Sequence, residues 1–179
     1  MKTTQMLIAG FGGQGILFAG KFLAYKGLTE DLQVSWLPSY GPEMRGGTCN
    51  CSVTVSDDPI GSPLILEPNE LLVMNTPSFD KFIGSVKAGG IAVIDSTLVE
   101  GTTDRTDIKC FYVPATKLAS ENNLKGMANI ILAGKLLKEA CLTDQAAIDK
   151  AIKKVIPPKK ADLTDANIAA LKLGMEYEG

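Results

Sequence analysis

The sequence predicts an α/β fold: a Rossmann-like, mostly parallel sheet with helices on both faces, followed by a helical C-terminal part. Short apolar segments alternate with segments of helical periodicity, which is typical of parallel strands joined by helices. A glycine-rich motif separates the first strand from the first helix. The 179 residues, 45% of them hydrophobic and 21% charged, suffice for one core, so we expect a single domain over residues 1–179.

The first half of the chain is expected to hold three strands and one helix. The apolar residues from Ile16 to Leu23 recur three positions apart and form one helical stripe. Pro38 is expected to end the second strand, and the alternation of the third suits an edge or a hairpin better than the sheet centre. The expected elements are the strand 5–9, the turn 10–15, the helix 16–27, the strand 33–37, the loop 39–47 and the strand 48–55.

The second half is expected to alternate strands with helices and then become helical. Thr76 and Pro77 form a helix start, with Thr76 as the N-cap and Pro77 as the first helical residue, and Gly89-Gly90 ends that unit. Pro157-Pro158 interrupts the helical C-terminal part. The expected strands are 71–74, 91–94 and 109–113, and the expected C-terminal helices are 115–122, 126–140, 144–154 and 162–176.

The glycine motif, Gly10-Phe11-Gly12-Gly13-Gln14-Gly15, follows a strand and opens a helix. Glycines allow a tight turn, and a helix N-terminus presents unpaired N–H groups to an anion. A dinucleotide would also require an acidic residue at the end of the second strand, and the sequence Val34 to Pro38 has none. Three interpretations stay open: a dinucleotide, close helix–strand packing alone, and contact with a phosphate or a subunit.

The loop after the second strand carries an isolated arginine. Lysines outnumber arginines sixteen to two, and Arg45 lies between Glu43 and a glycine pair. A guanidinium supplies a planar fork for a carboxylate or phosphate, while a local ion pair with Glu43 is the structural alternative. The candidate binding residues of this loop are Ser39, Tyr40, Gly41, Glu43, Arg45, Gly46 and Gly47. The neighbouring Trp36, Leu37, Tyr40 and Met44 are expected to form an apolar interface.

Composition limits the remaining possibilities. The net charge of −2 gives no basic surface for nucleic acid, and no apolar run is long enough for a membrane span. No secretory signal is recognised at the N-terminus, so we expect a cytoplasmic protein. The chain has no histidine, and its four cysteines lack the spacing of an iron–sulfur site, so we expect reduced thiols and no catalytic or metal-ligating residue. Cys49 and Cys51 should point to the same face of a strand.

The two motifs together resemble the γ subunit of 2-oxoacid:ferredoxin oxidoreductases, whose module also forms one domain of longer single-chain pyruvate enzymes. The first is G-F-G-G-Q-G, and the second, about thirty residues later, is S-Y-G-P-E-M-R-G-G. Further segments of the chain resemble the same family: Leu72-Val73-Met74-Asn75, Val113-Pro114-Ala115-Thr116, Ala128-Asn129, Leu132-Ala133-Gly134, Asn167 and Gly174. The resemblance covers nearly the whole chain and is nearest to the 2-oxoglutarate type. It identifies residues 1–179 as a pyruvate/ketoisovalerate oxidoreductase γ-type domain.

The resemblance implies oxidative decarboxylation of a 2-oxoacid to acyl-CoA and CO2, with electrons passed to ferredoxin. It implies that thiamine diphosphate, Mg²⁺ and iron–sulfur clusters belong to the α and β subunits and a ferredoxin-like fourth subunit. This chain is expected to be inactive alone and to contact coenzyme A through the glycine loop and Arg45. A homodimer would cover part of its interface when isolated. The alternatives are a nucleotide-binding or scaffolding module and a stand-alone dinucleotide-dependent dehydrogenase.

Overall fold

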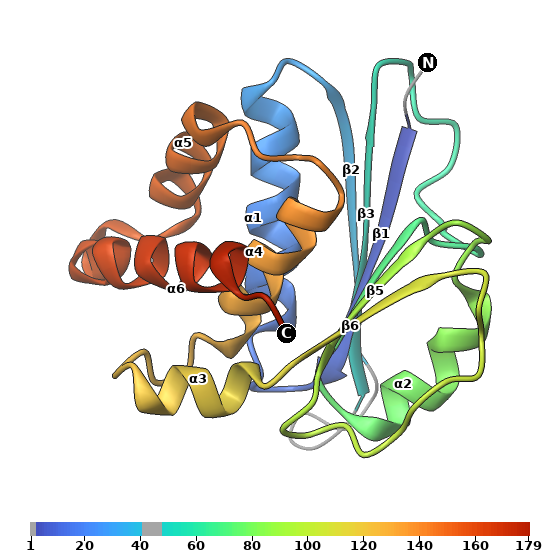
Figure 1. Cartoon of the computed structure of the whole chain (residues 1–179). Helices are drawn as coiled ribbons and strands as arrows, with labels where there is room; N and C mark the ends of the chain where they lie inside the picture. The colour runs from blue at the N-terminus through green and yellow to red at the C-terminus, as the bar shows by residue number, and fades with distance from the viewer. Residues whose placement is uncertain (1–2, 41–47) are drawn as a thin grey trace.

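The computed structural model describes residues 3–40 and 48–179 and contains six strands and six α-helices within them (Figure 1). The strands are β1 (Thr3–Phe11), β2 (Gln33–Tyr40), β3 (Thr48–Ser56), β4 (Glu70–Val73), β5 (Ile91–Asp95) and β6 (Lys109–Val113). The α-helices are α1 (Ile16–Thr29), α2 (Thr76–Phe82), α3 (Ala115–Glu121), α4 (Ala128–Glu139), α5 (Gln145–Val155) and α6 (Thr164–Glu176). Short 3₁₀ helices follow α2 (Ile83–Ser85) and precede α6 (Pro158–Leu163).

The six strands form one sheet in the order β2-β3-β1-β4-β5-β6. The pairings β1–β4, β4–β5 and β5–β6 are parallel, whereas β1–β3 and β2–β3 are antiparallel. The α/β class is therefore confirmed, with three parallel pairings out of five and an antiparallel hairpin at one side. Helices α1, α4, α5 and α6 lie on one face and α2 on the other (Figure 1).

The hairpin confirms one prediction about the strands and corrects another. The prediction of a hairpin for 48–55 is confirmed, but β3 is not an edge strand, because it pairs with β1 on one side and β2 on the other. Apolar and polar residues alternate along β3 because helices cover only one of its faces. Pro38 does not end the second strand, which continues to Tyr40. Because β2 is the edge of the sheet, the missing N–H of Pro38 is tolerated there.

Helix α2 begins one residue earlier than its sequence suggests. Asn75, and not Thr76, is the N-cap, since its side-chain oxygen accepts a hydrogen bond from the Ser78 N–H at 2.8 Å. Pro77 is then the second helical residue, where its missing N–H is also harmless. Both an asparagine and a threonine can cap a helix, so the sequence alone does not choose between these neighbours.

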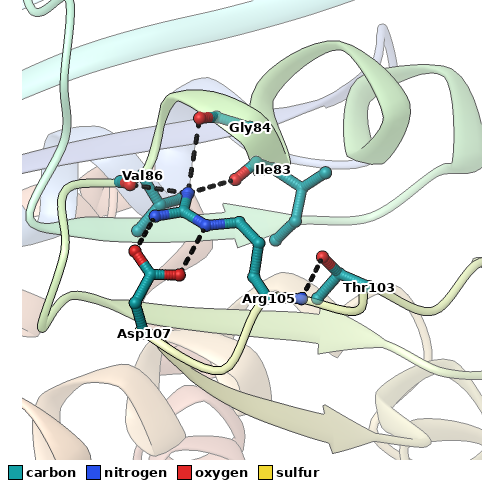
Figure 2. A network of polar contacts seen from close by, with 6 residues as sticks. All are labelled: Ile83, Gly84, Val86, Thr103, Arg105 and Asp107. Carbon is teal, nitrogen blue, oxygen red and sulfur yellow. Dashed lines mark hydrogen bonds and ion pairs between the residues drawn. The ribbon is translucent and has the colours of Figure 1, made fainter.

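Arg105 fixes the connection between β5 and β6 to the end of the α2 unit (Figure 2). Its Nη1 donates to the carbonyl oxygens of Ile83 at 3.0 Å and Val86 at 2.7 Å, and also to that of Gly84. Its Nε and Nη2 bind the two carboxylate oxygens of Asp107 at 2.9 and 2.5 Å. These hydrogen bonds lower the pKa of Asp107. One of the two arginines of the chain is thus structural, because a guanidinium can satisfy helix-end carbonyls and a carboxylate together.

The larger core lies between the sheet and the α1 layer, and its C-terminal helices cross closely. An added Cβ at Gly134 in α4 would collide with the Leu171 carbonyl oxygen, and one at Gly174 in α6 would collide with the Ile131 carbonyl oxygen. Each glycine therefore lies against the backbone of the opposite helix. This contact holds α6 against α4, which packs separately against the sheet.

Gly174→Ala should destabilise the protein, although alanine is the better helix former by about 1 kcal/mol. The new methyl group meets backbone rather than a flexible side chain, so the helices must separate. We expect a net loss of roughly 1–3 kcal/mol, measured by urea denaturation. Gly61→Ala is the matched control, because an added Cβ there meets nothing within 4 Å, and it should change stability by less than about 0.5 kcal/mol. Equal stability of Gly174→Ala and the wild type would contradict the close crossing.

Candidate functional site at the carboxyl edge of the sheet

The carboxyl ends of β1 and β4 form the point where the chain divides between the two faces of the sheet. After β1 the chain enters α1 on one face, and after β4 it enters α2 on the other (Figure 1). Open α/β sheets bind ligands at such a switch point. The end of β2 lies at the same edge, because Gly10 pairs with Cys49 and Cys49 with Tyr40. The strands β1 and β2 therefore end at the same edge of the sheet.

The glycine turn is tightly packed at two of its positions. An added Cβ at Gly10 would lie 2.6 Å from Gln14 Oε1, and one at Gly15 would lie 2.5 Å from Asn129 Nδ2. Gly13 and Gly15 have φ angles of 95° and 76°, which other residues rarely adopt. Gly13 is exposed, and an added Cβ there meets nothing within 4 Å. The glycines of this turn thus serve close packing at Gly10 and Gly15 and a left-handed backbone at Gly13 and Gly15.

Gln14 connects the glycine turn to the neighbouring strand. Its Oε1 accepts a hydrogen bond from the Phe11 N–H at 2.6 Å, and its Nε2 donates to the Met74 carbonyl oxygen at 2.9 Å. Because Met74 follows β4, the Gln14 side chain joins the end of β1 to the end of β4 at the switch point. Gln14 was predicted as a binding residue, and the structure assigns it this structural contact.

Asn129 holds the same turn from the opposite side. This side chain is 3% exposed, and its Nδ2 donates to the Gly15 carbonyl oxygen at 2.9 Å. Gly15 is the N-cap of α1, and no side chain caps the first turn of that helix. Asn129 Oδ1 accepts no hydrogen bond from the described residues. The amide thus fixes the start of α1, while its buried oxygen has no partner among the described residues.

A hollow of about 330 Å³ lies beside the glycine turn. The residues around it include Gly13, Gln14, Met74, Thr116, Lys125 and Ala128. Lys125 is exposed and is its one charged lining residue, and Lys125 also borders a second hollow of about 340 Å³ that includes Gly15 and Asn129. A small molecule with an apolar part and an anionic group matches this lining.

Asp95 positions the far wall of the hollow. This carboxylate is fully buried at the end of β5. Its Oδ2 accepts a hydrogen bond from the Thr116 hydroxyl at 2.6 Å, and its Oδ1 accepts one from the Thr97 N–H at 3.0 Å. A buried carboxylate requires such donors to offset its lost hydration. Thr116, which lines the hollow, is therefore held in place by Asp95.

The structure brings part of the predicted site together. Gly10, Gly12, Gly13, Gln14 and Gly15 form the turn, of which Gly13 and Gln14 line the first hollow and Gly15 the second. Ser39 is exposed near the end of β2, and Tyr40 is the last residue of that strand. Gly41, Glu43, Arg45, Gly46 and Gly47, together with Met44, lie outside the described residues.

Trp36 and Leu37, two members of the predicted apolar interface, lie on opposite faces of the sheet. Trp36 lies on the α1 face, near Gly20, whereas Leu37 lines a hollow on the α2 side of the sheet. Neighbouring strand residues point to opposite faces, so these two side chains cannot form one patch.

Lys125, Met74 and Asn129 were not predicted as site residues. Met74 and Asn129 did belong to segments that resemble the family, but nothing in their own pattern indicated a site. Lys125 follows Leu124 between two helices, and one lysine among sixteen carries no local signal. Its place in the site depends on tertiary structure alone.

The four cysteines form no disulfide. Cys49 and Cys51 are both buried in the core on the α1 face, as their spacing predicts. Burial raises the pKa of the Cys51 thiol to about 12. The described residues contain no group of three or more candidate metal ligands, and none of the helices within them is long and apolar enough to cross a membrane.

Comparison with known proteins places this fold in a family. Residues 5–177 match the family described as pyruvate ferredoxin/flavodoxin oxidoreductase, and the chain belongs to it. The chain is similar to the 2-oxoglutarate synthase subunit KorC of Methanocaldococcus jannaschii, with 32% identity over 96% of this chain and 92% of the relative.

The chain is also similar to the ketoisovalerate oxidoreductase subunit VorA of Methanothermobacter marburgensis, with 33% identity over 98% of this chain. It spans 37% of that relative's length, and it spans 36% of the VorA protein of Methanothermobacter thermautotrophicus. The relatives thus include proteins that extend far beyond the region matched by this chain.

Two solved structures share the fold. The γ subunit of a keto/oxoacid ferredoxin oxidoreductase from Geobacter sulfurreducens has a TM-score of 0.85 at 25% identity, covering 98% of this chain and 96% of that one. The 2-oxoglutarate:ferredoxin oxidoreductase from Magnetococcus marinus, with 2-oxoglutarate, coenzyme A and succinyl-CoA bound, has a TM-score of 0.85 at 19% identity. The match covers 98% of this chain and 31% of that one.

Gln14→Glu should destabilise the protein although it preserves side-chain size. The substitution replaces the Nε2 donor with an oxygen that faces the Met74 carbonyl at close range. We expect a loss of about 1–3 kcal/mol in the free energy of unfolding at neutral pH. Gln33→Glu, at an exposed position of β2, is the control and should be nearly neutral. A Gln14→Glu protein as stable as the control would show that the bond to Met74 is unimportant.

Cys51 should resist alkylation while the protein is folded. Iodoacetamide reacts with thiolates, and a thiol with a pKa of about 12 stays protonated at pH 8. Mass spectrometry should detect the label on Cys141, which is exposed, and on Cys51 only after unfolding. Above pH 9 the unfolded thiol loses its proton first, so the stability contributed by Cys51 should decline between pH 9 and 12. Rapid labelling of Cys51 in the native protein would contradict its burial.

Proposed function

We propose that this chain is the γ subunit of a 2-oxoacid:ferredoxin oxidoreductase that converts a 2-oxoacid and coenzyme A to acyl-CoA and CO2. The observation that carries the proposal is the hollow beside the glycine turn, which lies at the switch point of a fold belonging to this family. Its lining suits binding of an extended anionic ligand. The chain contributes this surface to an active site whose chemistry resides in its partners.

Coenzyme A is the ligand that we propose for this edge. It combines phosphates with a long, partly apolar arm, which corresponds to a lysine beside a largely apolar hollow. Gly13 N–H and Lys125 would hold a phosphate, and the arm would pass along the second hollow, which Gly15 and Asn129 line. Arg45 remains the proposed second anion ligand, on the loop that follows β2 at the same edge.

Thiamine diphosphate, Mg²⁺ and iron–sulfur clusters are proposed to reside in the α and β subunits and a ferredoxin-like fourth subunit, with ferredoxin as the electron acceptor. When bound there, thiamine diphosphate supplies the decarboxylation chemistry and the clusters carry the electrons. The whole complex is proposed to be cytoplasmic. The partner chains would therefore be needed for any turnover.

The proposed 2-oxoacid is 2-oxoglutarate. The KorC relatives support this choice, because the similarity covers 92% of the protein from Methanocaldococcus jannaschii. The VorA relatives favour a branched-chain acid instead. Initial rates of the reconstituted complex with 2-oxoglutarate, 2-oxoisovalerate and pyruvate distinguish these choices.

The dinucleotide-dependent alternative has little support in the topology. Dinucleotide-binding sheets place a parallel second strand next to the first strand, and its end contacts the ribose. Here the antiparallel β3 occupies that position. A scaffolding role without a ligand is tested by the measurement below.

Lys125→Met should raise the KM of the assembled enzyme for coenzyme A and leave the KM for the 2-oxoacid unchanged. Loss of one charge-assisted hydrogen bond, worth about 1.5–3 kcal/mol, corresponds to roughly ten- to a hundredfold. Arg45→Ala should act in the same way, and Arg45→Lys should restore little, because an ammonium cannot reproduce the fork. Lys150→Met, at an exposed position of α5, is the control.

The chain by itself should show no turnover of a 2-oxoacid with a redox dye, and activity should appear only with the α and β chains. Turnover by the isolated chain would contradict the proposed role. A changed KM for the 2-oxoacid alone would assign Lys125 and Arg45 to the substrate instead. An unchanged KM for both would favour the scaffolding alternative.

A further inference from the structure

One half of the sheet lacks a helix on the α2 side. The smaller core on that side draws its buried residues from β1, β4, β5 and the segments near α2, and includes none from β2 or β3. On the hairpin, the residues that face this side include Leu37 and Ser52, which are paired across the two strands. The α2 layer therefore stops at β1 and leaves the hairpin face uncovered by a helix.

A hollow of about 560 Å³ occupies this uncovered part of the sheet. Leu37, Asn50 and Ser52 of the hairpin border it together with Lys81 and Phe82 of α2. Its other side is formed by Leu64 to Leu66, in the connection between β3 and β4, which lies on the same side of the sheet as α2 (Figure 1). The hollow is thus a groove between α2 and the connection, in the layer where a further helix could pack.

Two leucines at this groove are unusually exposed. Leu64 is 65% exposed and Leu66 is 84% exposed, the highest values among the large apolar side chains of the described residues. They are two positions apart and both border the same hollow. Exposed apolar side chains grouped around a hollow are typical of a surface that contacts another protein.

The charge of the groove indicates the chemistry of its occupant. Lys81 is the one charged residue among those that border it. Its Nζ lies 5.1 Å from the centre of the Phe82 ring, and no carboxylate among the described residues forms an ion pair with it. An occupant with an apolar ridge and one carboxylate would complement both the leucines and the lysine.

We propose that this groove seats a catalytic chain of the same oxidoreductase, through an apolar ridge flanked by a carboxylate. The inference rests on the proposed function. It draws on the relatives of which this chain spans only 36–37%, since the matched region there is one part of a longer polypeptide. The groove also begins at Leu37 to Ser39, directly before the segment that carries Arg45, the proposed second anion ligand of the shared active site.

The same charge argues against a second copy of this chain as the occupant. In a symmetric dimer the same surface meets itself. Two grooves face to face would bring two Lys81 side chains together, and the residues that border the groove supply no carboxylate. A catalytic chain with a carboxylate at this position has no such cost.

The double variant Leu64→Asp/Leu66→Asp tests the surface. Both side chains point largely into solvent, so the folded chain should keep its melting temperature, which circular dichroism checks. The affinity for the purified catalytic chains, measured by biolayer interferometry, should fall at least about tenfold, since buried charges oppose an apolar interface. Lys81→Glu should also weaken binding by reversing the local charge. Leu28→Asp, at a leucine that is 51% exposed elsewhere, is the control and should bind normally.

The outcomes separate this inference from the function on which it rests. If the wild-type chain does not bind the catalytic chains at all, the proposed function is contradicted. If the wild type, the double variant and Lys81→Glu all bind normally, the groove is not the docking surface, and the proposed function is unaffected. Sedimentation that shows a homodimer of the wild type, dissociated by the double variant, would overturn the groove inference as well by naming a second copy as the occupant.

Discussion

The architecture depends on how the short turn after β1 is held from two sides. Gln14 binds this turn to the end of β4, and Asn129 binds it to α4. Gly10 and Gly15 leave no room for a side chain at these two contacts, so the turn cannot shift toward either neighbour. The start of α1 is therefore fixed relative to both the sheet and the helix layer. Gln14 and Met74 line the first hollow at this edge, and Gly15 and Asn129 line the second, so these contacts position residues of both.

The topology of the sheet explains why a glycine motif that is common in dinucleotide enzymes can serve another purpose here. In such enzymes a parallel strand lies beside the first strand and contributes to nucleotide binding. In this chain an antiparallel hairpin occupies that side of the sheet, and its end returns to the same edge as the turn. The edge therefore combines the glycine turn, the Lys125 segment and the end of β2. A surface assembled from three separate segments suits a subunit that completes a site on a partner chain.

The sequence predicted the class of fold and all six strands, because apolar runs and glycine or proline boundaries are local signals. It placed β3 in a hairpin but did not choose between an edge and a hairpin position, since a strand's neighbours depend on the whole sheet. It ended β2 early, since Pro38 is tolerated only because β2 is an edge. It located the glycine turn but not the roles of its members: Gln14 makes a structural contact sixty residues away, and Lys125 reaches the hollow from a loop without a motif. Contacts of such long range have no local pattern, whereas the buried pair Cys49 and Cys51 followed directly from strand geometry.

The central claim is that the carboxyl edge between β1 and β4 is a ligand surface completed by partner chains. A structure of the assembled enzyme with coenzyme A bound tests it most directly. The account predicts phosphate density within hydrogen-bond distance of Lys125 Nζ and the Gly13 N–H, with the arm passing Asn129. Coenzyme A bound wholly within the partner chains, with the hollow beside the glycine turn open to water, would contradict it.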